Sequence, residues 1–148
     1  CPVAALEKTA IGAVIYHRER CIGCRYCVIA CPFKIPKYEW SKTLPYVRKC
    51  DFCHDRIVNG QPPACAAVCP TGALLYGDRD DLLLEARKRL RRSPAKYIDH
   101  VYGEREVGGT SLLLISDLPL EKLGYPANLA EDPVLHRSAL PVQYQQAG

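Results

Sequence analysis

The segment that decides the fold runs from residue 21 to residue 32 and reads Cys21-Ile22-Gly23-Cys24-Arg25-Tyr26-Cys27-Val28-Ile29-Ala30-Cys31-Pro32. Its spacing, C-x2-C-x2-C-x3-C-P, is the one that wraps a cubane iron–sulfur cluster. The first three thiolates can point inward from one tight loop, whereas the fourth points elsewhere, toward another cluster. Pro32 turns the chain because its φ angle is fixed and it has no N–H, and Gly23 lets the backbone pass close to the inorganic core. Zinc and disulfides are the alternatives, although zinc sites favour two separated C-x2-4-C pairs.

The composition is typical of a small protein that depends on bound metal for folding. The chain has 148 residues and nine cysteines, and the large hydrophobic residues between the cysteines are few and scattered. We expect one or two small domains in which clusters do much of the work of folding, as structural metals do elsewhere. The net charge of +4 is modest, and no dense basic run with interleaved aromatics indicates nucleic-acid binding.

The sequence is expected to be an internal piece of a longer protein, because it contains no methionine. No signal peptide is visible. No apolar run approaches the roughly 20 residues that are needed to span a bilayer.

An internal repeat links the start of the chain to its middle. Residues 1–6 and residues 69–74 both read C-P-x-x-A-L, and each repeat leads into a short apolar run. Cys1 is therefore interpreted as the closing cysteine of a motif whose first three cysteines come before it, and the alternative is a spare thiol. Gly12 is expected to make a turn that leads into a short strand over residues 13–16.

A second cysteine set follows: Cys50-x2-Cys53, then eleven residues, then Cys65-x3-Cys69-Pro70. The final C-x3-C-P matches the end of the first motif, and residues 59–63 read as an inserted loop. Taken alone, this set could bind zinc. Beside the first motif and its matching ending, a second cluster is the preferred interpretation. His54 is a conceivable ligand, but it is more simply a polar neighbour of Cys53, because enough cysteines are present.

The regions between and after the cysteines carry weaker signals. Residues 33–49 are too rich in proline for a helix, and their aromatic residues are expected to pack over the cluster loops and exclude water. Residues 78–92 are predicted to form an amphipathic helix, capped by Asp78 or Asp80 and ended by Pro94. A strand is predicted over residues 112–115. The proline-containing stretch after residue 117 is expected to be an extended tail.

Three parts of the chain resemble the second, third and fourth cysteine motifs of four-cluster ferredoxin-like electron-transfer subunits: Cys1-Pro2, residues 21–32 and residues 50–70. Such subunits serve molybdenum oxidoreductases such as respiratory formate dehydrogenase, and certain membrane-bound nickel–iron hydrogenases. The segment 102–110 and the sequence Leu123-Gly124-Tyr125-Pro126 look most like the hydrogenase and formate dehydrogenase members. The resemblance covers residues 1 to about 130.

The resemblance implies an interleaved pairing of cysteines with [4Fe-4S] clusters, four in the family pattern. One cluster is held by Cys21, Cys24 and Cys27, with Cys1 as its fourth ligand. Cys31 closes a second cluster, whose other ligands come before Cys1. Cys50, Cys53 and Cys65 hold a third cluster, and Cys69 closes a fourth. Only the first cluster finds all four of its ligands in this sequence.

The expected fold class is α+β, a ferredoxin-like dicluster fold with cysteine-rich loops, short strands and helices, and an extended C-terminal tail. The expected domains are a cluster domain over 1–77, a helix and strand packing on it over 78–117, and a tail or partner-docking segment over 118–148. Family members often carry a transmembrane helix after the tail, and none is seen here.

The function that the resemblance implies is electron relay, without catalysis, between a hydrogenase or molybdoenzyme catalytic subunit and an integral-membrane quinone-reactive subunit. The resemblance also suggests a membrane-associated location on the periplasmic, outer face of the cytoplasmic membrane. Two other classes stay open: an iron–sulfur domain of a soluble oxidoreductase with its own catalytic cofactor, and a zinc-stabilised interaction module.

The thin core and the density of cysteines predict that the chain folds only with iron and sulfide bound. Circular dichroism of the metal-free protein should show no cooperative thermal transition, whereas the reconstituted protein should show one. A cooperative transition without metal would contradict this prediction.

Overall fold

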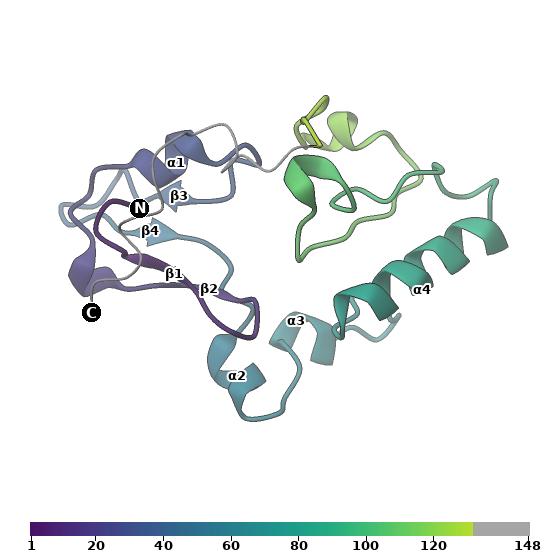
Figure 1. Cartoon of the computed structure of the whole chain (residues 1–148), viewed down its shortest axis with the longest axis horizontal. Coiled ribbons are helices and arrows are strands. Elements are labelled where there is room, and N and C mark those ends of the chain that lie inside the picture. The colour runs from purple at the N-terminus through teal and green to yellow at the C-terminus, as the bar shows by residue number, and fades with distance from the viewer. Residues whose placement is uncertain (132–148) are drawn as a thin grey trace. The chain divides into compact units, whose positions relative to one another are not determined.

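A computed structural model describes residues 1–131, which divide between two compact units, one over residues 1–77 and one that begins at Asp78 (Figure 1). Residues 132–148 of the predicted tail lie outside the described part of the chain. The division of the C-terminal half at residue 118 stays a prediction. The elements of the first unit are β1 (Leu6–Lys8), β2 (Val14–Tyr16), η1 (Arg18–Arg20), α1 (Tyr26–Ala30), β3 (Lys37–Tyr38), β4 (Val47–Arg48), α2 (His54–Val58) and α3 (Ala64–Ala67). The second unit contains α4 (Arg79–Arg92), η2 (Glu106–Gly108) and η3 (Leu120–Leu123).

The first hairpin pairs β1 with β2 antiparallel, so that Leu6 lies opposite Tyr16. Its turn is closed by Thr9, whose backbone N–H and hydroxyl both donate to the Ala13 carbonyl at 2.7 Å and 3.0 Å. Gly12 adopts a φ of +85°, which favours glycine. The predicted turn and strand over residues 13–16 are therefore confirmed.

A second hairpin, β3–β4, occupies the region that the sequence indicated only as a connection. It is held by the Glu39 carboxylate, which accepts hydrogen bonds from Lys42 Nζ and Arg48 Nε at 2.8 Å each. Both hydrogen bonds lower the pKa of Glu39, and the one from Lys42 has the larger effect. The prediction that its aromatics exclude water is wrong for Trp40, whose surface is 68% exposed. Trp40 instead contacts Tyr38 edge-on and lies under the Arg25 guanidinium.

Three turns with the sequence C-P-x-x repeat one backbone conformation, at residues 1–4, 31–34 and 69–72. In each, the N–H of the last residue donates to the carbonyl of the cysteine, at 3.4, 3.0 and 3.4 Å respectively. In each, that last residue has a positive φ, of 50°, 53° and 61°. The first two turns lead into hairpins, whereas the apolar residues 74–76 after the third are exposed and pair with no strand in the described part of the chain. The repeat read from the sequence is thus a repeated turn.

The hydrophobic core of the described residues is thin. In the first unit it consists of Ala5, Ala13 and Val47, and in the second of Leu90, Val101 and Tyr102. No large side chain among residues 1–131 is completely removed from solvent. Lys49 links β2 to the second cysteine segment, because its ammonium group donates hydrogen bonds to the Val14 and Cys50 carbonyls.

Helix α4 begins and ends where the sequence predicted. The Asp78 carboxylate accepts a hydrogen bond from Asp80 N at 2.9 Å and caps the first turn. Leu82, Leu83 and Ala86 are half-buried and Leu90 is buried, so the predicted apolar stripe faces the interior of its unit.

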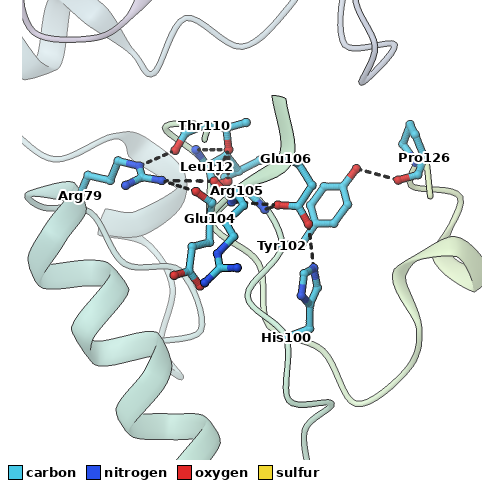
Figure 2. Close-up of polar contacts among 10 residues, drawn as sticks. Arg79, His100, Tyr102, Glu104, Arg105, Glu106, Thr110, Leu112 and Pro126 are labelled. Atoms are coloured by element: carbon cyan, nitrogen blue, oxygen red, sulfur yellow. Dashed lines mark hydrogen bonds and ion pairs between the residues drawn. The ribbon is translucent and has the colours of Figure 1, made fainter. Parts of the chain in front are cut away.

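Arg79, in the first turn of α4, holds the loop that follows Tyr102 (Figure 2). Its guanidinium donates to three backbone carbonyls, those of Thr110 at 2.9 Å, Glu104 at 3.0 Å and Gly103 at 3.4 Å. Because carbonyls inside a packed loop need donors, this one side chain fixes the path of residues 103–110.

The Glu106 carboxylate also holds this loop in place (Figure 2). It accepts hydrogen bonds from His100 Nε2 at 2.7 Å and from Gly103 N at 2.7 Å. Burial opposes ionisation, but these hydrogen bonds outweigh it, so that the pKa of Glu106 is lowered.

The predicted strand over residues 112–115 is wrong. Only Leu114 makes a bridge, exchanging two hydrogen bonds of 2.9 Å with Tyr102. The Tyr102 hydroxyl donates to the Pro126 carbonyl at 3.0 Å, and its ring meets Tyr125 edge-on. The apolar run therefore packs in an irregular loop because the neighbouring backbone turns at glycines and offers no longer edge to pair with.

Across the described residues, the structure contains no helix with the length and apolar character that crossing a membrane requires.

We predict that Gly103→Ala destabilises the second unit far more than Gly124→Ala. Both glycines have positive φ angles, +91° and +83°. A Cβ on Gly103 would overlap the Leu112 carbonyl oxygen and lie 2.5 Å from Thr110 Oγ1, whereas one on Gly124 meets nothing within 4 Å. Strain alone should lower the free energy of unfolding by about 1 kcal/mol at Gly124, and strain plus overlap by about 3 kcal/mol or more at Gly103.

Hydrogen exchange of residues 101–114 in the metal-loaded protein measures this difference. Equal effects of the two substitutions would contradict the close packing at Gly103.

Candidate metal centre

The first cysteine loop is shaped by two left-handed backbone positions on either side of Cys24. Gly23 has a φ of +70° and Arg25 a φ of +60°. Arg25 precedes α1, which places Cys27 in the first turn of that helix and Cys31 directly after its end. The loop therefore reverses around Cys24, as the spacing of the motif predicted.

Four of the predicted ligands line one small cavity of the first unit: Cys1, Cys21, Cys24 and Cys27. Apolar residues of the first hairpin and of β4 form much of the remaining wall, among them Ala5, Leu6 and Val47. Cys1 reaches this place because the β1–β2 hairpin folds residues 1–8 back beside the Cys21 loop. A cysteine twenty residues earlier in the sequence thus joins the three cysteines of the loop.

Cys31 faces elsewhere. It lines a separate hollow with Ile29, Lys34, Tyr38 and Trp40, and it is not among the residues around the cavity of Cys1. The physical cause is that Cys31 lies one helical turn beyond Cys27 and has extended backbone, with φ −75° and ψ 112°, directly after α1 ends. This is the arrangement that interleaved pairing requires, and the ligation itself stays a prediction.

The second cysteine set is as exposed as the four cysteines of the cavity. Cys50 and Cys65 are exposed, as Cys1 and Cys24 are, and Cys65 lies in α3. The loop turns through two successive left-handed residues, Phe52 and Cys53, and Asp51 Oδ1 accepts from Cys53 N at 2.8 Å. His54, the alternative ligand, lies 3.8 Å from the carboxylate of Asp55.

Cys69 lies in an environment that favours the thiolate. A hydrogen bond from the Thr71 hydroxyl, then backbone N–H groups of the following residues, chiefly that of Leu74, lower its pKa to about 7. A thiolate is the form that binds a metal. The C-P-x-x turn therefore suits a ligand at Cys69.

Within residues 1–131, no three His, Cys, Asp or Glu side chains converge so as to hold a single metal ion. A cubane makes a different demand, because it takes one cysteine sulfur at each of its four irons. Four cysteines around a common cavity are the donor set of that group.

A further side chain at this cavity, Tyr16, gives its wall a hydrogen-bond donor. Its hydroxyl is buried and, in the described part of the chain, has no hydrogen-bond partner, and Tyr16 lines the cavity of Cys1, Cys21 and Cys27. Burial, followed by the neighbouring Cys21 thiol, raises the pKa of Tyr16 to about 12, so the group is a donor at ordinary pH. The thiolates and sulfides of a cluster would supply the missing acceptor.

Sequence reasoning did not find Tyr16, Arg25 or Arg79. Tyr16 looked like an ordinary strand residue, and its position five residues before Cys21 was the available signal. Arg25 and Arg79 bind an aromatic pair and a set of carbonyls that only the folded chain assembles.

Comparison with known proteins agrees with this chemistry. The family described as the 4Fe-4S dicluster domain matches residues 1–79. A protein of Nitratidesulfovibrio vulgaris is 43% identical over 84% of this chain and 34% of its own length. The hydrogenase-2 operon protein HybA of Escherichia coli O157:H7 is 38% identical over 85% of this chain and 46% of its own length. The nitrate-inducible formate dehydrogenase iron–sulfur subunit of Escherichia coli K12 is 40% identical over 78% of this chain and 40% of its own length.

The chain therefore spans less than half the length of these three relatives. The predicted resemblance and the α+β ferredoxin-like fold class are confirmed by the family match and by the short strands and helices of the structure.

We predict that Cys1→Ser and Cys24→Ser remove the same paramagnetic resonance signal from the reduced protein, while Cys31→Ser and Cys53→Ser each remove a different one. The reason is that Cys1 and Cys24 share a cavity, whereas Cys31 lines another hollow. Joint loss of one signal in Cys24→Ser and Cys31→Ser, with Cys1→Ser unaffected, would show local instead of interleaved ligation.

Proposed function

Because this chain belongs to the 4Fe-4S dicluster family, whose domain covers its first 79 residues, we propose that it is an electron-transfer component of a larger oxidoreductase. It relays electrons between a catalytic subunit and a quinone-reactive membrane subunit, and it performs no catalysis itself. The observation that carries the proposal is the placement of Cys1, Cys21, Cys24 and Cys27 around one cavity while Cys31 faces another hollow.

This placement suits a relay because it ties two clusters to one rigid element. Cys27 lies within α1 and Cys31 caps it, so that about four residues of helix, roughly 6 Å of rise, separate two ligands of neighbouring clusters. Electrons need a fixed, short path between clusters, and one helical turn provides it. The protein's own contribution is this spacing, together with burial and hydrogen bonds that tune each cluster.

The proposed cluster number is four, with the interleaved pairing that the resemblance implies. Cys50, Cys53 and Cys65 serve a third cluster and Cys69 a fourth. In the family pattern, the remaining ligands of these two sets come from a cysteine motif that this sequence does not contain.

The proposed catalytic partner is a hydrogenase or a formate dehydrogenase of the molybdoenzyme type. It is supported by the names of two relatives, a hydrogenase-2 operon protein and a formate dehydrogenase iron–sulfur subunit. The proposed location is the outer face of the cytoplasmic membrane, beside the quinone-reactive subunit, and it rests on the family resemblance.

The test uses the complete complex, purified without oxygen through a tag on the full-length protein. Iron and acid-labile sulfide should be present in equal amounts. With hydrogen or formate as donor, the wild-type complex should reduce a water-soluble quinone.

The Cys24→Ser complex should lose quinone reduction and retain reduction of a viologen dye that takes electrons directly from the catalytic subunit. Zinc in place of iron would instead support an interaction module. Undiminished quinone reduction in Cys24→Ser would place this chain outside the electron path.

A further inference from the structure

The Tyr16 hydroxyl is an unpaired polar group at the cavity of Cys1, Cys21, Cys24 and Cys27. It is buried and makes no hydrogen bond of full geometry within residues 1–131, although the Cys21 thiol and the Val47 backbone lie beside it. Buried hydroxyls nearly always find a hydrogen-bond partner, because leaving one unpaired lowers stability. The acceptor for Tyr16 is therefore expected among the cysteine sulfurs that line the cavity, in their metal-bound thiolate form.

The backbone holds Tyr16 firmly in this position. It is the last residue of β2 and pairs with Leu6 across the hairpin, and the next residue, His17, donates its N–H to Ala5 O at 2.8 Å. Ala5 is buried and lines the same cavity. The backbone is therefore held by hydrogen bonds at Tyr16 and at the residue that follows it.

The charged groups around the cavity leave Tyr16 as the neutral donor nearest to the cysteines. Arg25 is the cationic residue that lines it. Its guanidinium is engaged by the rings of Tyr38 and Trp40, at 5.4 Å and 5.0 Å from their centroids. No carboxylate is among the described residues that line the cavity, and the Cys21 thiol is the side chain that lies against the Tyr16 hydroxyl.

We propose that the Tyr16 hydroxyl donates a hydrogen bond to the Cys21 thiolate and thereby raises the reduction potential of the cluster that Cys1, Cys21, Cys24 and Cys27 hold. This inference rests on the ligation in the proposed function. Reduction adds one electron to the cluster and breaks no bond, and the proton stays on the Tyr16 oxygen. Because the reduced cluster is the more negative, a donor to its thiolate stabilises that form more.

Tyr16 is thus a positioning and tuning residue, and its effect is read as a potential. The experiment is a dithionite titration of the full-length holoprotein in its complex, followed by paramagnetic resonance. The relevant signal is the one that Cys24→Ser removes. The variant is Tyr16→Phe, which deletes only the hydroxyl, and the control is Tyr97→Phe in the second unit.

The expected result is a tenfold fall in the equilibrium constant for reduction of this cluster in Tyr16→Phe, which is a midpoint lower by about 59 mV for one electron. Tyr97→Phe should leave the midpoint unchanged, as should Tyr16→Phe for the cluster that Cys53→Ser removes. An unchanged midpoint in a Tyr16→Phe protein with full iron and sulfide would overturn the inference and leave the proposed function intact.

If the Tyr16→Phe protein loses the cluster, the crystal structure of the wild-type holoprotein tests the proposal instead. That structure should place the Tyr16 oxygen within hydrogen-bond distance of the Cys21 sulfur, and any other partner for the hydroxyl would overturn the proposal. If Cys24→Ser removed no signal, the proposed ligation would fail and the role of Tyr16 with it.

Discussion

The first unit depends on one backbone constraint: its cysteine segments must reverse within three or four residues so that sulfurs from different segments face a common space. The chain meets it with left-handed positions, and not all of them are glycines. The non-glycine positions in this unit are Ala4, Arg25, Lys34, Phe52 and Cys53. Each is disfavoured by roughly 1–2 kcal/mol. Few buried side chains offset that strain. Bonds between thiolates and iron would supply the difference, and folding would then be coupled to cluster binding.

The hairpins then decide which cysteines meet. The β1–β2 hairpin brings Cys1 to the Cys21 loop and sets Tyr16 at the wall of the same cavity. One turn of α1 separates Cys31 from Cys27, so that Cys31 lines a different hollow. Neighbouring clusters would therefore share a continuous stretch of backbone, so that a change in one loop is felt at two metal sites. The tuning role proposed for Tyr16 uses the same hairpin that brings Cys1, the proposed fourth ligand, to the cavity.

The second unit contains no cysteine, so that protein contacts alone hold its loops. Its loop after Tyr102 is held by Arg79, which donates to three carbonyls, and by the Glu106 carboxylate. Gly103 lets the backbone pass where a side chain would overlap Leu112. The segment over residues 102–110, which resembles the hydrogenase and formate dehydrogenase members in sequence, is thus a packed polar loop. Its residues are explained by packing, without assigning them a chemical role.

The sequence by itself determined the cluster chemistry, the repeat and helix α4. Spacing of two or three residues fixes which cysteines share a loop, C-P-x-x fixes a local turn, and the apolar stripe ended by Pro94 fixes a helix, because all three are local properties. Tertiary structure decided the rest. The irregular path of residues 112–115, the hairpin around Glu39, the exposure of Trp40 and the carbonyls gathered by Arg79 depend on partners distant in sequence. The meeting of Cys1 with Cys21 was implied by family resemblance, and only the folded hairpin gives its physical reason.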